Sequence, residues 1–203
     1  PEESLQWCAR VVDASKELGA RAIRIDVVPG KLRGKRDEFL KFSIEMGKKL
    51  VALVEDSRIR FGIENHGDTT NDPTFLHDLF EGVQSPKLGI TLDTANFYWF
   101  GHPLEKLYEI FQTVAPYACH THCKSIKFPD DKKNEQRPMG WEYGKYNCPV
   151  YAGDIDFARL VKILHEAGYT GDLCIENESL GKFPEAERGD VLRKEVEFLQ
   201  KLV

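Results

Sequence analysis

The sequence has little of what a membrane protein or a nucleic-acid-binding protein needs. None of its apolar runs approaches the roughly 20 residues of a transmembrane helix. Lys and Arg number 28 against 33 Asp and Glu, and the net charge of −5 argues against nucleic-acid binding by bulk electrostatics. We therefore expect neither a nucleic acid nor a membrane as a partner.

Cysteine is scarce and odd in number. Of five cysteines, Cys119, Cys123 and Cys174 fall in predicted strands, where a reduced cysteine packs as a small apolar residue. This usage predicts free thiols and a reducing, cytoplasmic location. The chain has no short-period repeat and no low-complexity segment. The apolar content of 41% predicts one globular domain over residues 1–203.

Helix and strand patterns alternate along the chain. Apolar residues at helical spacing predict helices at 2–19, 37–56, 72–83, 102–116, 154–168 and 184–202. Short apolar, β-branched runs predict strands at 20–26, 60–64, 88–94, 118–124 and 171–176, with a stub at 149–151 inside a long polar loop at 127–152. This alternation indicates parallel strands joined by crossover helices.

The predicted fold class is therefore α/β, a TIM (β/α)8-type barrel of parallel strands. A closed barrel of this type has about eight strands, so about three βα units are missing from the front. An unclosed barrel exposes two sheet edges and one side of its core, which favours aggregation. We expect either that the natural chain is longer or that two chains dimerise across the gap.

Polar chemistry follows four of the predicted strands. Their C-terminal ends carry Glu64, Asp93, His122 and Glu176. An α/β barrel builds its active site from such strand ends, so we expect these side chains to converge. Three carboxylates in a small space repel one another, and a divalent cation relieves the repulsion. Carboxylate and imidazole donors without a thiolate suit Mn²⁺, Mg²⁺, Co²⁺ or Zn²⁺.

Each of these residues also has a purely structural interpretation. A carboxylate there could cap a helix or form a salt bridge, but four polar strand ends together favour a metal site. Side chains two apart on a strand share a face, so either His120 or His122 could be the ligand. The two-residue spacing between His122 and Lys124 favours His122 as the ligand. Phe97 and Trp99 are expected to pack the barrel rim rather than line a substrate pocket.

The motifs at the strand ends resemble those of a known superfamily. The order of Ile63-Glu64-Asn65-His66, Leu92-Asp93-Thr94, His122-Cys123-Lys124 and Gly168-Tyr169-Thr170-Gly171 before Ile175-Glu176 is similar to that of the xylose-isomerase-like barrels. That superfamily contains sugar epimerases, sugar-phosphate and hydroxypyruvate isomerases, inosose dehydratases and the endonuclease IV type of repair enzyme. The resemblance covers nearly the whole chain and implies that it supplies barrel strands four to eight.

The resemblance also implies roles for individual residues. Glu64, Asp93, His122 and Glu176 would hold one divalent metal ion. Glu64 and Glu176 would also be catalytic in an isomerase or epimerase acting on a sugar, sugar phosphate or related hydroxy-ketone. One glutamate would remove the proton beside the carbonyl and the other would return it, through a metal-stabilised cis-enediolate. Substrate would be bound by His66, Asn96, Lys124, His120 and Glu178.

One position departs from the family pattern, and two other functions stay open. Asn96 stands where the family often has histidine, which weighs against a three-zinc endonuclease site. The first alternative is a metal-dependent dehydratase of a cyclic polyol or keto-acid. The second is a non-catalytic fragment or binding module on the same scaffold. Metal content and proton exchange beside a ketose carbonyl distinguish the three functions.

Overall fold

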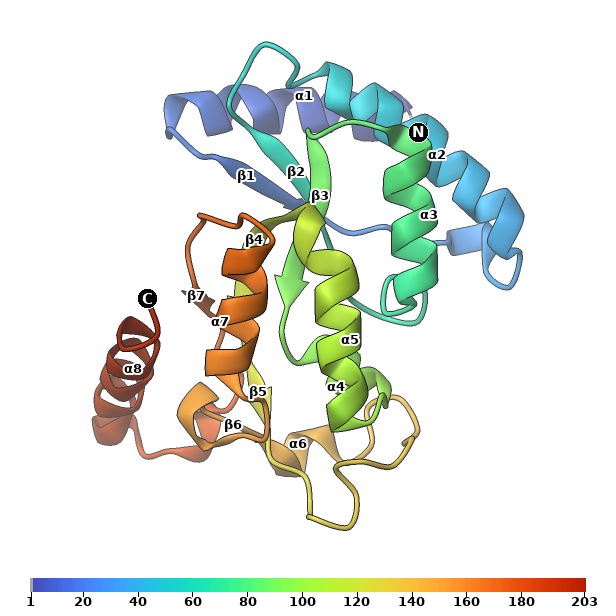
Figure 1. Cartoon of the computed structure of the whole chain (residues 1–203). Coiled ribbons are helices and arrows are strands. Elements are labelled where there is room, and N and C mark those ends of the chain that lie inside the picture. Colours follow the sequence, from blue (N-terminus) through green and yellow to red (C-terminus); the bar gives the residue numbers. More distant parts are fainter. Residues whose placement is uncertain (1) are drawn as a thin grey trace. The chain divides into compact units, whose positions relative to one another are not determined.

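The computed structural model describes residues 2–203 (Figure 1). The α-helices are α1 (Glu2–Glu17), α2 (Arg36–Ala52), α3 (Pro73–Val83), α4 (Asn96–Phe100), α5 (Leu104–Val114), α6 (Tyr143–Tyr146), α7 (Phe157–Glu166) and α8 (Glu185–Gln200). The strands are β1 (Ala22–Ile25), β2 (Arg60–Glu64), β3 (Leu88–Asp93), β4 (Ala118–Cys123), β5 (Ser125–Ile126), β6 (Asn147–Cys148) and β7 (Cys174–Ile175). Short 3₁₀-helices are η1 (Gly30–Leu32), η2 (Ala115–Tyr117), η3 (Val150–Ala152) and η4 (Leu180–Lys182).

Five strands form one sheet in the order β1-β2-β3-β4-β7. The β1–β2, β2–β3 and β4–β7 pairs are parallel, whereas β5 and β6 form a separate antiparallel pair. A parallel sheet whose strands alternate with helices is the architecture of the TIM barrel, and the predicted fold class is confirmed. No helix within residues 2–203 is long and apolar enough to cross a membrane.

The chain divides into two compact units, which are described separately. The first unit runs to Thr91 and includes Tyr117–His120. It contains β1, β2 and helices α1 to α3, with the Phe39 and Phe75 rings stacked 5.5 Å apart in its core. Helix α3 begins where the sequence predicts, because the Asp72 side chain accepts the Thr74 backbone N–H at 2.9 Å.

Close packing inside the first unit explains a glycine in the middle of β2. A Cβ at Gly62 would lie 2.3 Å from Thr91 Oγ1 and 2.8 Å from Cys119 Sγ. No side chain fits on that face of the strand at this level. Glu64 lies on the same face two residues later. The strand therefore has room for a functional side chain at Glu64 and none at Gly62, the position below it on this face.

The second unit comprises Leu92–Pro116 and Thr121–Val203. Arg137 lies inside the long polar loop at 127–152 of this unit and stabilises its conformation. The guanidinium lies 4.6 Å from the centre of the Tyr98 ring and 4.3 Å from that of Phe128. It donates hydrogen bonds to several backbone carbonyls, including that of His102 at 2.9 Å. The loop is thus a packed structure built around one buried cation.

The predicted strand stub at 149–151 is wrong, because these residues begin a 3₁₀-helix, η3. The Val150 backbone N–H donates to the buried Glu195 carboxylate at 2.9 Å, and the Ala152 N–H donates to the Pro149 carbonyl at 2.9 Å. Neither amide is available to a strand ladder. The Glu195 carboxylate, on helix α8, therefore favours the 3₁₀-helix η3 over a strand.

The last strand is shorter than the sequence predicts, since β7 spans only two residues of the expected 171–176. The Asp172 carbonyl accepts hydrogen bonds from the Thr121 hydroxyl at 2.7 Å and the Tyr169 hydroxyl at 2.8 Å. Side chains thus replace the ladder partner of this carbonyl, and pairing starts only at Cys174.

Candidate metal centre

Asp93 ends β3 and is fully buried in the second unit. Its Oδ1 accepts the backbone N–H groups of Ala95 and Asn96, each at 2.9 Å. These bonds stabilise the start of α4, a short helix that sequence analysis missed. The structural interpretation of Asp93 as a helix cap is therefore correct for one oxygen. The other oxygen, Oδ2, faces a cation.

That cation is Lys124, which is 6% exposed. Its Nζ lies 2.9 Å from Asp93 Oδ2, 2.9 Å from Glu176 Oε2 and 2.9 Å from Glu178 Oε1. Burial alone would lower the pKa of the Lys124 ammonium. The three carboxylates, Asp93 foremost, outweigh burial, so the pKa lies above its ordinary value. Lys124 is therefore charged at neutral pH and holds the carboxylates together.

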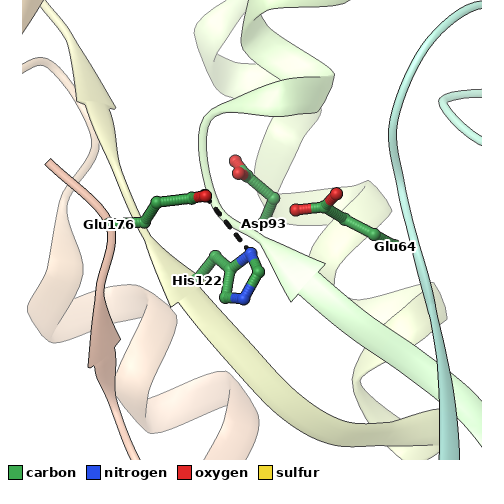
Figure 2. Close-up of side chains that lie close together, drawn as sticks. All are labelled: Glu64, Asp93, His122 and Glu176. Atoms are coloured by element: carbon green, nitrogen blue, oxygen red, sulfur yellow. Dashed lines mark ion pairs between the residues drawn. The ribbon is translucent and has the colours of Figure 1, made fainter. Parts of the chain in front are cut away.

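His122 and Glu176 complete a cluster with Asp93. His122 Nδ1 lies 3.2 Å from Glu176 Oε2, the contact dashed in Figure 2. Asp93, His122 and Glu176 each offer one ligand atom, and these atoms lie within 4.8 Å of one another. Two ligands about 2.1 Å from one ion lie at most about 4.2 Å apart, so small side-chain movements suffice to coordinate it.

Backbone hydrogen bonds hold the three strand ends in register. Thr94, directly after β3, donates its N–H to the His122 carbonyl at 3.0 Å. Its hydroxyl donates to the Lys124 carbonyl at 2.6 Å and accepts the Lys124 N–H at 2.9 Å. The Glu176 N–H donates to the Cys123 carbonyl at 3.1 Å. These bonds place candidate ligands that are far apart in the sequence next to one another.

Glu178 is bound from both sides by groups that can donate protons. Its Oε1 accepts from Lys124 at 2.9 Å, and its Oε2 accepts the Tyr143 hydroxyl at 2.5 Å. Burial, followed by the Glu178 carboxylate, raises the pKa of Tyr143 above its ordinary value, so its hydroxyl remains a donor at neutral pH. Sequence analysis missed Tyr143, because nothing in the loop pattern marks it as a neighbour of a strand end.

The charges of this cluster suit a divalent cation. Three carboxylates surround one ammonium, so negative charge exceeds positive charge among these four groups. Such an excess is relieved by a 2+ ion. Carboxylate oxygen and imidazole nitrogen donors, with no thiolate among them, fit Mg²⁺, Mn²⁺, Co²⁺ and Zn²⁺. The residues present therefore fit a metal ion.

Glu64, the fourth side chain labelled in Figure 2, ends β2 and belongs to the first unit. It is 3% exposed and forms an ion pair with Arg24 of β1. The carboxylate of Asp26 and the Nδ1 of His66 lie nearby, and one ligand atom from each of the three acidic or imidazole groups falls within 4.8 Å of the others. Sequence analysis missed Arg24, although a charged side chain within a short parallel strand was a usable signal.

The residues predicted to bind substrate have different surroundings. His66 is largely exposed, at 58% of its side chain, whereas Asn96 is buried at the start of α4. His120 lies on β4 within the first unit and is partly exposed. The histidine that joins the cluster with Asp93 is His122, as the spacing to Lys124 favours.

Comparison with known proteins shows what the chain is similar to. A family model described as the xylose isomerase-like TIM barrel matches residues 1–202. A curated but uncharacterised protein of Methanocaldococcus jannaschii is 26% identical over 147 residues, which is 70% of this chain and 45% of the relative. The chain thus spans less than half the length of that relative.

Solved structures share the fold. The IOLI protein, whose crystal structure contains a zinc atom, superposes with a TM-score of 0.74 at 17% identity, covering 100% of this chain and 71% of that one. A D-tagatose 3-epimerase-like protein gives a TM-score of 0.67 at 21% identity, covering 98% and 71%. A barrel protein from Mycobacterium smegmatis in complex with magnesium gives 0.67 at 18% identity, covering 99% and 67%.

Proposed function

Because the chain belongs to the xylose isomerase-like TIM barrel family, we propose that it is a divalent-metal-dependent isomerase or epimerase of a sugar, sugar phosphate or related hydroxy-ketone. The observation that carries the proposal is the cluster of Asp93, His122 and Glu176 at the ends of β3, β4 and β7. Similar proteins of known structure hold zinc or magnesium, and one is epimerase-like, which supports this choice.

Glu64 is the fourth ligand in this proposal. In the β2–β3 register Glu64 pairs with Thr91, and Asp93 follows two residues later on the same face of β3. Its burial supports the assignment, because a carboxylate with 3% exposure is costly unless cations are bound to it. In the absence of metal, Arg24 supplies that positive charge.

The two glutamates carry the protons. The metal, when bound, would polarise the substrate carbonyl. Glu176, whose side chain is 41% exposed, has solvent access to exchange a proton. One of Glu64 and Glu176 removes the proton beside the carbonyl, and the other returns a proton to the neighbouring carbon or the opposite face. His122 holds its Nδ1 toward Glu176 and orients that carboxylate.

The remaining polar residues bind substrate oxygens. Lys124 and Glu178 present an ammonium and a carboxylate next to the ligand cluster, and we assign them to substrate hydroxyl groups. Asn96, His66 and His120 are the other proposed contacts. The free thiol state of all five cysteines supports a reducing, cytoplasmic location.

A second reaction of the same site is dehydration of a cyclic polyol or keto-acid. The observation that favours it is the pairing of Glu178 with Lys124 and Tyr143, since either donor can hydrogen-bond to a departing hydroxyl. A probable 3-DHS dehydratase from Bacillus anthracis has the same fold, with a TM-score of 0.61 at 16% identity.

Metal binding and proton exchange test the proposal. Stoichiometric uptake of Mn²⁺, Mg²⁺, Co²⁺ or Zn²⁺ and exchange of the proton beside a ketose carbonyl in D₂O are expected. Both Glu64→Gln and Glu176→Gln abolish exchange, whereas Glu166→Gln on the exposed surface of α7 does not. Loss of water without an epimer indicates the dehydratase. A chain that binds no divalent cation is a non-catalytic module.

We also propose that the chain forms a homodimer, the alternative being that it belongs to a longer natural protein. Strands β1 and β7 are the two edges of the sheet, and an edge strand invites pairing or covering by another chain. Light scattering coupled to gel filtration gives the mass directly, and a monodisperse monomer contradicts this assembly.

A further inference from the structure

The first unit contains a cavity of about 710 Å³ lined by residues of α1, α2 and the sheet. Ile63 of β2 lines it, and Glu64, the next residue, projects from the opposite face of the strand. The cavity therefore lies on the helix side of β2, whereas Glu64 lies on the other side of that strand. Its volume falls in the range of about 300–1,000 Å³ typical of small-molecule pockets.

The wall of this cavity is apolar along most of its length. It is formed largely by Leu5, Val28, Phe39, Phe42, Met46 and Leu50. Two of these side chains, Val28 and Phe42, are 70% and 39% exposed. The cavity thus opens to solvent through an apolar rim, which an aliphatic chain can enter.

A hydroxyl group within the apolar wall has no protein partner. Ser43 lines the cavity and is 6% exposed. Its Oγ has no hydrogen-bond partner among residues 2–203. A buried hydroxyl is destabilising unless it bonds to something, so a ligand oxygen at this point would stabilise the complex.

A cation stands beside the rim. Lys31 of η1 lines the cavity, is exposed and forms no ion pair within residues 2–203. Asp26 also lines the cavity, but its carboxylate accepts a hydrogen bond from Arg24 at 3.1 Å. Lys31, which has no ion-pair partner within residues 2–203, therefore favours a negatively charged ligand group at the rim.

We propose that this cavity binds a medium-chain aliphatic carboxylate that carries an oxygen along its chain, such as a hydroxy or oxo acid. The chain lies between α1 and α2, the carboxylate pairs with Lys31, and the chain oxygen accepts the Ser43 hydroxyl. Arg or Lys pairing with a carboxylate and burial of an apolar chain are the interactions that hold such amphiphiles.

Titration calorimetry of the complete chain with 3-hydroxydecanoate, decanoate and 1-decanol tests the site. EDTA removes divalent metal, so that none of the compounds can bind to a metal ion in the protein. All three compounds are kept below their aggregation limits. We expect saturable binding in that order of affinity. Lys31→Gln weakens decanoate about tenfold, equivalent to about 1.4 kcal/mol, and leaves 1-decanol unchanged. Ser43→Ala removes the advantage of the hydroxy acid.

Lys41→Gln is the matched control, because Lys41 is exposed on α2 and does not line the cavity. Equal affinities of decanoate and 1-decanol, or no saturable binding of any compound, would overturn the proposal. So would a dimer that Phe42→Asp dissociates, since a second chain would then cover the rim. Unchanged circular dichroism of each variant confirms that it is folded.

Discussion

Lys124 Nζ lies 2.9 Å from Asp93 Oδ2, and both side chains are buried. Asp93 uses its other oxygen to accept the N–H groups that begin α4. One carboxylate therefore joins the start of a helix to the cation at the centre of the candidate site. A metal bound by Asp93 must share Oδ2 with Lys124 or displace it.

Replacing Lys124 separates its contribution to stability without metal from the stabilisation that a bound metal provides. Lys124→Met leaves the Asp93 carboxylate buried without its counter-charge, and the free energy of unfolding in EDTA should fall by about 3–5 kcal/mol. Divalent metal should restore part of the loss, about 2.7 kcal/mol at a concentration about 100 times the Kd. Urea unfolding with and without metal measures both. Lys106→Met on the surface of α5 is the control, and equal behaviour of the two variants would contradict this role.

Thr94 connects the ends of β3 and β4 through its hydroxyl. Thr94→Val keeps the shape of the side chain but removes its bonds to the Lys124 N–H and carbonyl. We expect a loss of about 1–3 kcal/mol of stability, because two buried backbone groups lose a partner. Metal affinity should fall with it, as the His122 and Asp93 strand ends lose their register. Thr113→Val, whose hydroxyl bonds the exposed Glu109 carbonyl, should change neither quantity.

Arg137 should determine the order of the loop at 127–152. Arg137→Leu removes its hydrogen bonds to backbone carbonyls and its stacking on Tyr98 and Phe128. Several carbonyls then lack partners, so we expect faster hydrogen exchange and earlier proteolysis within this loop. Arg193→Leu, at an exposed position of α8, should leave the loop protected. Unchanged exchange in Arg137→Leu would show that the loop is held by its other contacts.

Stability should fall at alkaline pH because of Cys119. Burial raises the pKa of its thiol from 9.0 to about 11. The unfolded chain therefore loses this proton at lower pH than the folded chain, and the free energy of unfolding declines as the pH rises from 9 toward 11. Urea unfolding across this range measures the slope. Cys119→Ala should reduce the slope without removing it, because burial also raises the pKa values of the Cys123 and Cys148 thiols. Cys8→Ala, which removes a less deeply buried thiol, should reduce the slope less.

Much of the candidate site follows from local sequence pattern. In a parallel sheet the C-terminal strand ends share one edge, so Asp93, His122 and Glu176 are found by locating the strands. The two-residue period of a strand also places His122 and Lys124 on the same face. The choice of these residues as metal ligands came from the resemblance to the xylose-isomerase-like barrels. The structure shows that their candidate ligand atoms lie close together.

Contacts between distant segments decided the rest. The pairing of Tyr143 with Glu178, the burial of Arg137 and the η3 helix that bonds Glu195 join residues far apart in the chain, and no local period encodes them. By itself the sequence determined the order of helices and strands and the polar strand ends, because hydrogen-bond geometry repeats along the chain. Only the tertiary structure decided which charges balance one another, because electrostatic and packing energies depend on distances that folding creates.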